Sequence, residues 1–322
     1  MIGNSLEDEM DRNDVDWKGY WAATPTPFTR EGKFDENGWR EGLRLYLRDG
    51  IHGVLVNGTT GEWFSQSDQE RKRVAEIAVE ELGGKIAVVV GCTTFTPQHT
   101  IELACHALSI KADGVMSTPP PYCAPIPREI VAYFQALSDH VPIPIMVYNW
   151  ARGTHVEITR DVALELAKIK HVVCLKDSTI HKAQMLETLE AVGDRLRVFS
   201  GFVNRLGIAV LQGLGGDGNI DGGAVIAREG VAFYEAVWRR DTAAAKKAAD
   251  RYVPFMSNLF KPDWSGRFGS PQPQLKATMN ILGQPGGYPR SPLLPVEDVE
   301  SLAAIRRILQ DAELLGSTAA AA

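Results

Sequence analysis

The sequence predicts a single (β/α)8 barrel of the TIM type with a helical extension at its C-terminal end. Three observations lead to this prediction. From residue 17 onward, eight short apolar runs alternate with longer segments of helical periodicity, which is the pattern of βα units. The runs are continuously apolar, as in parallel strands that helices cover. After about residue 223 the pattern becomes purely helical.

The predicted strands are short, and most of them end in a small or polar residue. They are Tyr20–Thr24, Gly53–Asn57, Ile86–Gly91, Gly114–Ser117, Ile143–Asn149, Val172–Lys176, Arg197–Ser200 and Gly216–Ile220. Eight parallel strands can close into a barrel, and a doubly wound open sheet is the alternative. No GxGxxG motif follows the first strand, so the dinucleotide-binding form of that alternative has little support.

Several predicted helices begin with an Asp, Ser or Thr cap or with a first-turn proline. The barrel helices are Asn37–Arg48, Asp68–Leu82, Pro97–Lys111, Pro127–Ser138, Thr159–Ile169, His181–Val192, the weaker Asn204–Leu211 and Val225–Arg239, and those beyond them are Ala243–Leu259, Gln274–Leu282 and Val296–Ala312. Residues 1–16 are acidic and carry no core pattern, so we expect a flexible or oligomer-contacting tail. The barrel is therefore placed at residues 17–240, and the extension packed on it at residues 241–322.

The composition favours a globular protein that acts on a small molecule. The formal net charge is −6 and no long run of lysine or arginine occurs, which argues against a nucleic-acid or anionic-membrane surface. No segment approaches the roughly 18 apolar residues of a membrane span, and no basic, apolar targeting segment is present. The four cysteines form no CxxC pair, which favours reduced thiols. We therefore expect a soluble, cytoplasmic protein.

Lys176 ends the sixth apolar run, HVVCLKD, and is the first candidate for chemistry. The working residues of barrel enzymes lie at the C-terminal ends of strands. Partial burial there lowers the pKa of an amine, which makes it a nucleophile near neutral pH. The alternative is a structural ion pair with the adjacent Asp177 or another carboxylate, and position alone does not decide between the two.

Tyr148 ends the fifth run and lies on the strand next to that of Lys176. Neighbouring strands are about 4.8 Å apart, so the phenol and the amine can meet over one substrate. A phenol hydroxyl both donates and accepts a hydrogen bond, which suits it to passing protons. The alternative is a tyrosine packed at a strand end with its hydroxyl satisfied locally.

A glycine-rich turn follows the second strand, where Gly58 and Gly61 bracket Thr59 and Thr60. Glycines permit a tight turn with N–H groups that point inward, and the two hydroxyls add further donors. The turn is therefore a candidate site for a substrate carboxylate. An ordinary βα loop is the alternative.

A second glycine cluster ends the eighth strand at residues 216–223 and contains Ile220. Main-chain groups in this region of a barrel can complete an anion or hydroxyl site, here near Lys176. The histidines show no HxH or HExxH spacing, so we expect no metal site.

Together these motifs resemble the dihydrodipicolinate synthase / N-acetylneuraminate lyase family of class I aldolases. The resemblance runs from about Trp17 to Pro295 and rests on motifs in the family's order: GTTGE at 58–62, YN at 148–149, Lys-Asp at 176–177, SG at 200–201 and PLLP at 292–295. It implies that Lys176 forms an imine with the 2-oxo group of pyruvate or a pyruvate-derived acid. It also implies that Tyr148 relays protons and that Thr59 and Thr60 hold the carboxylate. No metal or organic cofactor is then needed, because the lysine supplies the electron sink.

Two departures from the family pattern bear on the substrate. Synthases of the family usually carry an arginine five residues after this tyrosine for the carboxylate of the aldehyde substrate, but here that position is Gly153, and Arg152 lies one step earlier. The family's double tyrosine after Thr-Pro is replaced by Pro120 and Pro121, with Tyr122 shifted by one, so its proton relay across a subunit contact is altered or absent. The resemblance also implies a homo-oligomer, commonly a tetramer.

The sequence leaves three functions open. The first is an aldolase or dehydratase that acts on a 2-oxo acid, such as a 2-keto-3-deoxy sugar acid, through a lysine Schiff base. The second is 4-hydroxy-tetrahydrodipicolinate synthase of lysine biosynthesis. The third is a barrel that has lost catalysis and binds a ligand. Intact Lys176, Tyr148 and the paired threonines favour the first two.

Overall fold

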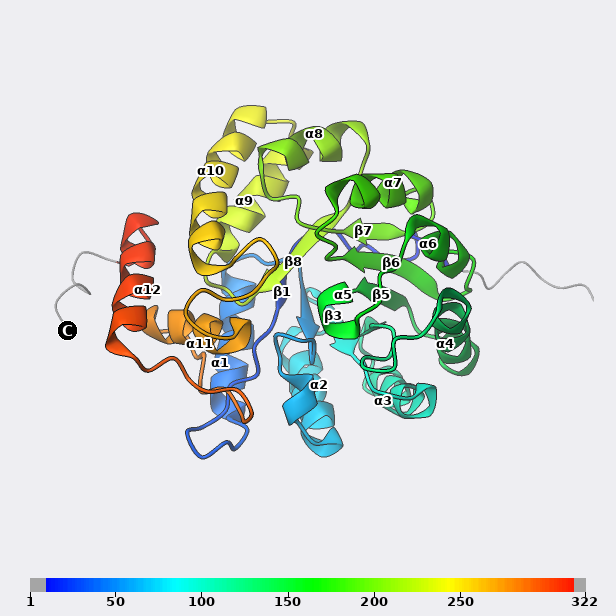
Figure 1. The fold of residues 1–322 in the computed structure, drawn as a ribbon, viewed down its shortest axis with the longest axis horizontal. Helices are drawn as coiled ribbons and strands as arrows, with labels where there is room; N and C mark the ends of the chain where they lie inside the picture. The colour runs from blue at the N-terminus through cyan, green and yellow to red at the C-terminus, as the bar shows by residue number, and fades with distance from the viewer. Residues whose placement is uncertain (1–9, 316–322) are drawn as a thin grey trace, which may run out of the picture.

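The computed structural model describes residues 10–315, and its eight strands form a closed parallel barrel (Figure 1). The strands are β1 Gly19–Ala23, β2 Gly53–Val56, β3 Ala87–Gly91, β4 Gly114–Ser117, β5 Ile145–Asn149, β6 Val172–Asp177, β7 Arg197–Phe199 and β8 Gly218–Gly222. Each strand pairs with the next, and β8 closes the barrel by pairing with β1, where Ile220 faces Trp21. The predicted (β/α)8 fold class is therefore confirmed, with strand ends within two residues of the predicted ones.

The helices that surround the barrel begin where the sequence offers capping groups. Ser67 accepts a hydrogen bond from the N–H of Glu70, whose side chain bonds back, which completes a capping box at α2. The elements between strands are α1 Glu36–Arg48, the 3-10 turn η1 Trp63–Ser65, α2 Asp68–Leu82, α3 Pro97–Ser109, α4 Pro127–His140, α5 Ala151–Thr154, α6 Arg160–Leu166, α7 Lys182–Val192 and α8 Arg205–Gly213. Two of these, η1 and α5, have no counterpart in the sequence prediction.

The C-terminal helices wrap one side of the barrel (Figure 1). They are α9 Ala227–Trp238, α10 Thr242–Leu259, α11 Pro271–Ile281 and α12 Val299–Asp311. Helix α10 packs on α9 and α8, and α12 packs on α10 and α11. The predicted helical extension is therefore present, and α11 reaches the barrel mouth, where Gln272 Nε2 donates to the carbonyl of Thr59 at 3.1 Å.

The apolar side chains form two cores, one inside the barrel and one between the strands and the helices. Alternate residues of each strand point to opposite faces, which divides them between the two cores. The inner core is formed by Val15, Trp17, Trp21, Ala23, Leu55, Val89, Met116, Met146, Tyr148, Val173, Cys174, Phe199 and Ile220. Because side chains fill the barrel, its open space lies at the mouth.

Residues 10–16, part of the expected flexible or oligomer-contacting tail, pack across the end of the barrel where the strands begin. Arg12 and Arg197 both contact Asp217, at 2.9 and 2.8 Å. Arg197 also donates to the carbonyl of Val15 at 3.1 Å, and the Val15 side chain is buried in the inner core. The buried carboxylate of Asp217 and its two arginine partners therefore hold residues 10–16 against the barrel, although the composition of this segment shows no core pattern.

Residues 1–9, the larger part of the predicted acidic tail, lie outside the described residues. Among the helices of residues 10–315, none combines the length and apolar character that crossing a membrane requires.

Candidate active site

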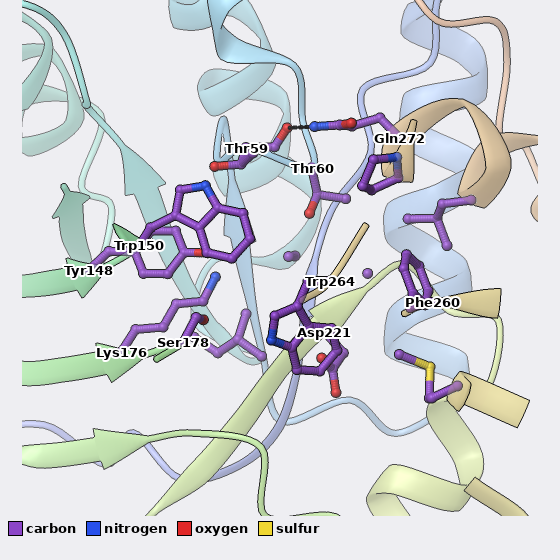
Figure 2. A pocket seen from close by; sticks show the side chains of 16 residues that line it. Thr59, Thr60, Tyr148, Trp150, Lys176, Ser178, Asp221, Phe260, Trp264 and Gln272 are labelled. Carbon is purple, nitrogen blue, oxygen red and sulfur yellow. Dashed lines mark hydrogen bonds between the residues drawn. The ribbon is translucent and has the colours of Figure 1, made fainter. Parts of the chain in front are cut away.

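Strands β5 and β6 bring Tyr148 and Lys176 side by side at the barrel mouth, since the two residues are register partners. The Nζ atom of Lys176 lies 4.0 Å from the centroid of the Tyr148 ring. Both side chains are buried, with Lys176 8% and Tyr148 5% exposed. The phenol and the amine that the sequence places on neighbouring strands thus lie together at the edge of one pocket (Figure 2).

Burial lowers the pKa of Lys176 to about 8, against smaller opposing effects of Asp221 and Cys174. A larger fraction of the amine is therefore uncharged near neutral pH than in an exposed lysine. The adjacent Asp177 is not its partner, because Asp177 Oδ1 instead accepts hydrogen bonds from Asn149 Nδ2 at 2.9 Å and from the N–H of Thr179 at 3.0 Å. The ion pair that the sequence left open is thus not formed, since consecutive strand residues face opposite sides.

Tyr148 is held between the amine and an indole. Burial raises its pKa, and a hydrogen bond with Ser178 has a smaller, opposite effect. The ring of Trp150 stacks on that of Tyr148, with centroids 5.8 Å apart and planes 19° from parallel. The phenol therefore stays protonated at neutral pH and can donate a proton or hydrogen bond to a ligand beside Lys176.

The turn after β2 places Thr59 and Thr60 on the pocket wall. Glu62, which follows the turn, adopts a left-handed backbone conformation with φ 58°, and Gln272 donates a hydrogen bond to the Thr59 carbonyl. Within residues 10–315, no protein group forms a hydrogen bond with either threonine hydroxyl. Both are therefore available to a ligand. Gly58, also a predicted substrate-binding residue, is buried behind them and does not line the pocket.

The pocket lies between the strand ends and the C-terminal helices, and Figure 2 shows the Lys176 amine pointing into it. It is lined by Ala23, Thr59, Thr60, Tyr148, Trp150, Lys176, Ser178, Ile220, Asp221, Gly222, Met256, Phe260, Trp264, Pro271, Gln272 and Leu275. Five of the six predicted site residues are among them. The outer wall, from Met256 onward, was not predicted, because which loop of the extension covers the mouth depends on how α10 and α11 pack.

Asp221, next to the predicted Ile220, is the main polar residue that the sequence analysis missed. Its Oδ2 atom accepts hydrogen bonds from Tyr252 Oη and Asn219 Nδ2. Burial raises the pKa of Asp221, while the Tyr252 hydrogen bond and the charge of Lys176 favour its ionised form. The signal was a carboxylate within the glycine cluster at the end of β8, where mouth residues are expected.

Tyr122 and Arg152, which lie where the sequence departs from the family pattern, do not line this pocket in the single chain. Tyr122 is 90% exposed, and Arg152 Nη1 donates to the carbonyl of Asp263 at 3.2 Å. At Gly153, an added Cβ would lie 2.5 Å from Cδ1 of Trp150. A side chain at position 153 would therefore require the indole to move.

A closed parallel barrel with a desolvated lysine, a buried tyrosine and a hydroxyl-lined turn at its mouth is the architecture of a class I lyase, which works through a lysine Schiff base. The chain belongs to the dihydrodipicolinate synthetase family, whose sequence model matches residues 16–312. The resemblance drawn from the motifs is therefore confirmed, and membership makes the protein a Schiff-base-forming lyase.

Individual relatives cover nearly the whole chain. A protein of Rhizobium meliloti named as an uncharacterized DapA-like lyase is 34% identical, over 88% of this chain and 92% of its own length. A 4-hydroxy-tetrahydrodipicolinate synthase of Methylobacterium radiotolerans is 31% identical, over 92% and 94% respectively. The crystal structure of dihydrodipicolinate synthase from Thermotoga maritima superposes with a TM-score of 0.85 at 25% identity, covering 94% of this chain and 100% of that one.

Proposed function

We propose that Lys176 is the nucleophile of this lyase and that it forms an imine with pyruvate or a pyruvate-derived 2-oxo acid. The observation that carries the proposal is the buried amine of Lys176, which has no carboxylate within ion-pairing distance in the described residues and points into the pocket beside Tyr148. Such an amine is nucleophilic near neutral pH. A barrel that only binds a ligand would have no need of a buried lysine held in this state.

The reaction begins when the neutral amine attacks the keto carbon of the substrate. Tyr148 supplies and recovers the proton that lets the carbinolamine lose water, and a protonated imine results. The hydroxyls of Thr59 and Thr60 hold the substrate carboxylate on the opposite wall. In this proposal each element at the mouth has one role. Strand β6 supplies the nucleophile, β5 supplies the proton relay, and the turn after β2 binds the substrate carboxylate.

The protonated imine then acts as an electron sink. When the C3–C4 bond of a 4-hydroxy-2-oxo acid breaks, its electron pair enters the imine to form an enamine. The 4-hydroxyl loses its proton, and an aldehyde leaves. Protonation of the enamine at C3 and hydrolysis by water release pyruvate and restore Lys176. Addition runs through the same steps in reverse, and elimination of water from the substrate uses the same imine.

Cleavage or dehydration of a 2-oxo acid fits the pocket better than the synthase reaction does. Lys176 is the only cationic side chain among the pocket-lining residues that the structure describes, and it is consumed by imine formation. At the position where the resemblance places an arginine, Gly153 has no side chain and Trp150 fills the adjacent space. A second substrate carboxylate would therefore find no positive partner on this wall.

We also propose that the protein is cytoplasmic and that it assembles as a homo-oligomer, with a tetramer as the form that the family resemblance implies. Three aromatic side chains on the loops after β2, β3 and β4 support this: Phe64 is 44%, Phe95 63% and Tyr122 90% exposed. These strands are neighbours in the barrel, so the loops share one face. Exposed aromatic groups gathered on one face are typical of an interface.

Borohydride trapping tests the central proposal. The protein is incubated with pyruvate and borohydride, digested and analysed for a mass increase on the peptide that contains Lys176. We expect the adduct there and not on the peptide with Lys276, a second buried lysine whose pKa is also lowered to about 8 but which does not line the pocket.

Two test variants and one control variant accompany this experiment. Lys176→Ala should abolish trapping and turnover in a folded protein, and Tyr148→Phe should slow imine formation by about 100-fold, the usual contribution of one acid–base group. Lys168→Ala, at an exposed surface pair, should trap pyruvate normally. An unlabelled Lys176 peptide from a folded protein would refute the proposal.

A further inference from the structure

The pocket has one end built for a carboxylate. Thr59 and Thr60 present two hydroxyls without protein partners in the described residues, on a turn that α11 holds in place through Gln272. Figure 2 shows the Lys176 amine and the side chain of Thr60 on two sides of the same space, so a 2-oxo acid would lie with its carboxylate on the threonines and its keto carbon at Nζ. The rest of the substrate then has to extend toward the outer wall.

The outer wall is apolar and largely aromatic. Trp150 extends from the end of β5, while Phe260 and Trp264 extend from the loop between α10 and α11. Met256 and Leu275 complete it from the helices on either side of that loop. Figure 2 shows Trp150 and Trp264 on opposite sides of the Lys176 amine. A planar apolar group that extends from the keto carbon would therefore lie between two indoles, which favours aromatic contact.

The wall also excludes a second negative charge. Beside the wall lies Asp221, the one carboxylate among the pocket-lining residues that the structure describes. It is partly exposed and already accepts hydrogen bonds from Tyr252 and Asn219 on a single oxygen. No donor in the described residues reaches the other oxygen, so the carboxylate presents an acceptor to the pocket. An adjoining crevice adds one cation, the exposed Lys182. A substrate carboxylate on the outer wall would meet Asp221 before it met a positive partner.

We infer that the substrate carries a single carboxylate and that its half beyond the pyruvate unit is uncharged and apolar, with an aromatic ring as the best fit. This inference rests on the proposed Schiff-base function and adds the substrate class. Trp150, Trp264 and Asp221 are then the residues that determine specificity. An aryl aldehyde is the matching product of cleavage.

Two probes that differ only in the remote half test the inference. The first is 4-hydroxy-2-oxo-4-phenylbutanoate, whose cleavage yields benzaldehyde and pyruvate. The second is 4-hydroxy-2-oxoglutarate, which carries a carboxylate in place of the ring and yields glyoxylate and pyruvate. Pyruvate release is measured for both. We expect kcat/KM for the phenyl probe to exceed that for the dicarboxylate by at least about tenfold, as expected when an unpaired charge is excluded.

Single-residue variants test which side chains determine the preference for the phenyl probe over the dicarboxylate. Trp264→Ala should lower kcat/KM for the phenyl probe by about tenfold and leave that for the dicarboxylate less affected. Asp221→Asn should raise kcat/KM for the dicarboxylate and so lower the ratio of kcat/KM between the phenyl probe and the dicarboxylate. Trp238→Ala, at an indole on α9 that is 44% exposed and does not line the pocket, should leave the ratio unchanged. If neither Asp221→Asn nor Trp264→Ala changes this ratio, the specificity role inferred for Asp221 and Trp264 is wrong.

The outcomes separate this inference from the function on which it rests. If pyruvate trapping on Lys176 fails, the proposed function fails with it. If trapping succeeds but the dicarboxylate is cleaved as well as or better than the phenyl probe, the inferred substrate class is wrong and the lyase stands. Trapping without any cleavage of the phenyl probe would likewise overturn the inference alone.

Discussion

Lys176 places an amine where its charged form is poorly solvated, and this affects folding as well as chemistry. Its pKa is about 8 in the folded protein and near the ordinary 10.5 in the unfolded chain. Below pH 8 both states bind the proton, so the folded state bears the full cost of burying it. As pH rises from 8 to 10.5 the folded state loses the proton first, and the cost disappears.

We therefore predict that Lys176→Met is more stable than the native protein at pH 7, by about 3 kcal/mol, the equivalent of a shift of this size. The difference should shrink as pH rises and vanish near pH 10.5. Urea unfolding of both proteins across this range measures it. Lys168→Met, at an exposed lysine, is the control and should be no more stable than the native protein at pH 7. A stability difference that is constant with pH would contradict the lowered pKa.

At the scale of single residues, the sequence predicted the half of the site that strands supply. Lys176 and Tyr148 end neighbouring strands, and strand ends in a barrel converge on one mouth, so their meeting follows from pattern alone. Trp264 could not be found in this way. It lies in a loop without periodicity, and only the packing of α10 and α11 brings that loop over the mouth. Gly58 shows a second limit of sequence-based prediction. It belongs to the same glycine-rich turn as Thr59 and Thr60, yet it is buried and does not line the pocket.

At the scale of elements, helix α11 supports the turn that carries Thr59 and Thr60 through a buried ion pair. Lys276 on α11 contacts Glu62, and the two side chains are 1% and 0% exposed. Lys276 Nζ also donates to the carbonyls of Thr26 at 2.7 Å and Tyr288 at 2.8 Å. Glu62 directly follows the turn with Thr59 and Thr60. The C-terminal extension is thus part of the framework of the pocket.

We predict that Glu62→Gln destabilises the fold by about 3–5 kcal/mol, the usual cost of leaving one buried charge unpaired. Because the turn would loosen, KM for the 2-oxo acid should rise more than kcat falls. Urea unfolding and steady-state kinetics measure the two effects. The control is Glu297→Gln, which breaks the exposed pair with Arg30 and should change neither. Unchanged unfolding in Glu62→Gln would show that α11 does not hold the turn.

The missed elements have a common cause. Helix α5 spans Ala151–Thr154 and η1 spans Trp63–Ser65, and neither is long enough to repeat an apolar position. Helix α2, with a capping box and about four turns of pattern, was predicted to the residue, and the other predicted helices begin and end within three residues of the observed ones. Periodicity thus predicts elements of two or more turns, whereas single turns are set by the loops that contain them.

For the whole molecule, the exposed aromatic face gives a prediction about assembly. Phe95→Glu should shift the protein to a smaller species in sedimentation velocity experiments, because the charge would be buried in the proposed interface. The control is Leu206→Glu, at a residue on α8 that is 65% exposed and far from these loops in the barrel order. It should sediment as the native protein does. A native protein that is monomeric at all concentrations would rule out the proposed oligomer.

The segment at residues 10–16 has a consequence for how the chain is made. Arg12 and its partner Asp217 are 205 positions apart, and Arg197 is 182 positions from the Val15 carbonyl that it binds. During translation Arg12 and Val15 therefore leave the ribosome long before these partners are synthesised. Residues 10–16 can take up their packed position only after β7 and β8 have been synthesised, because until then Arg12 lacks its carboxylate partner and the carbonyl of Val15 lacks the Arg197 donor.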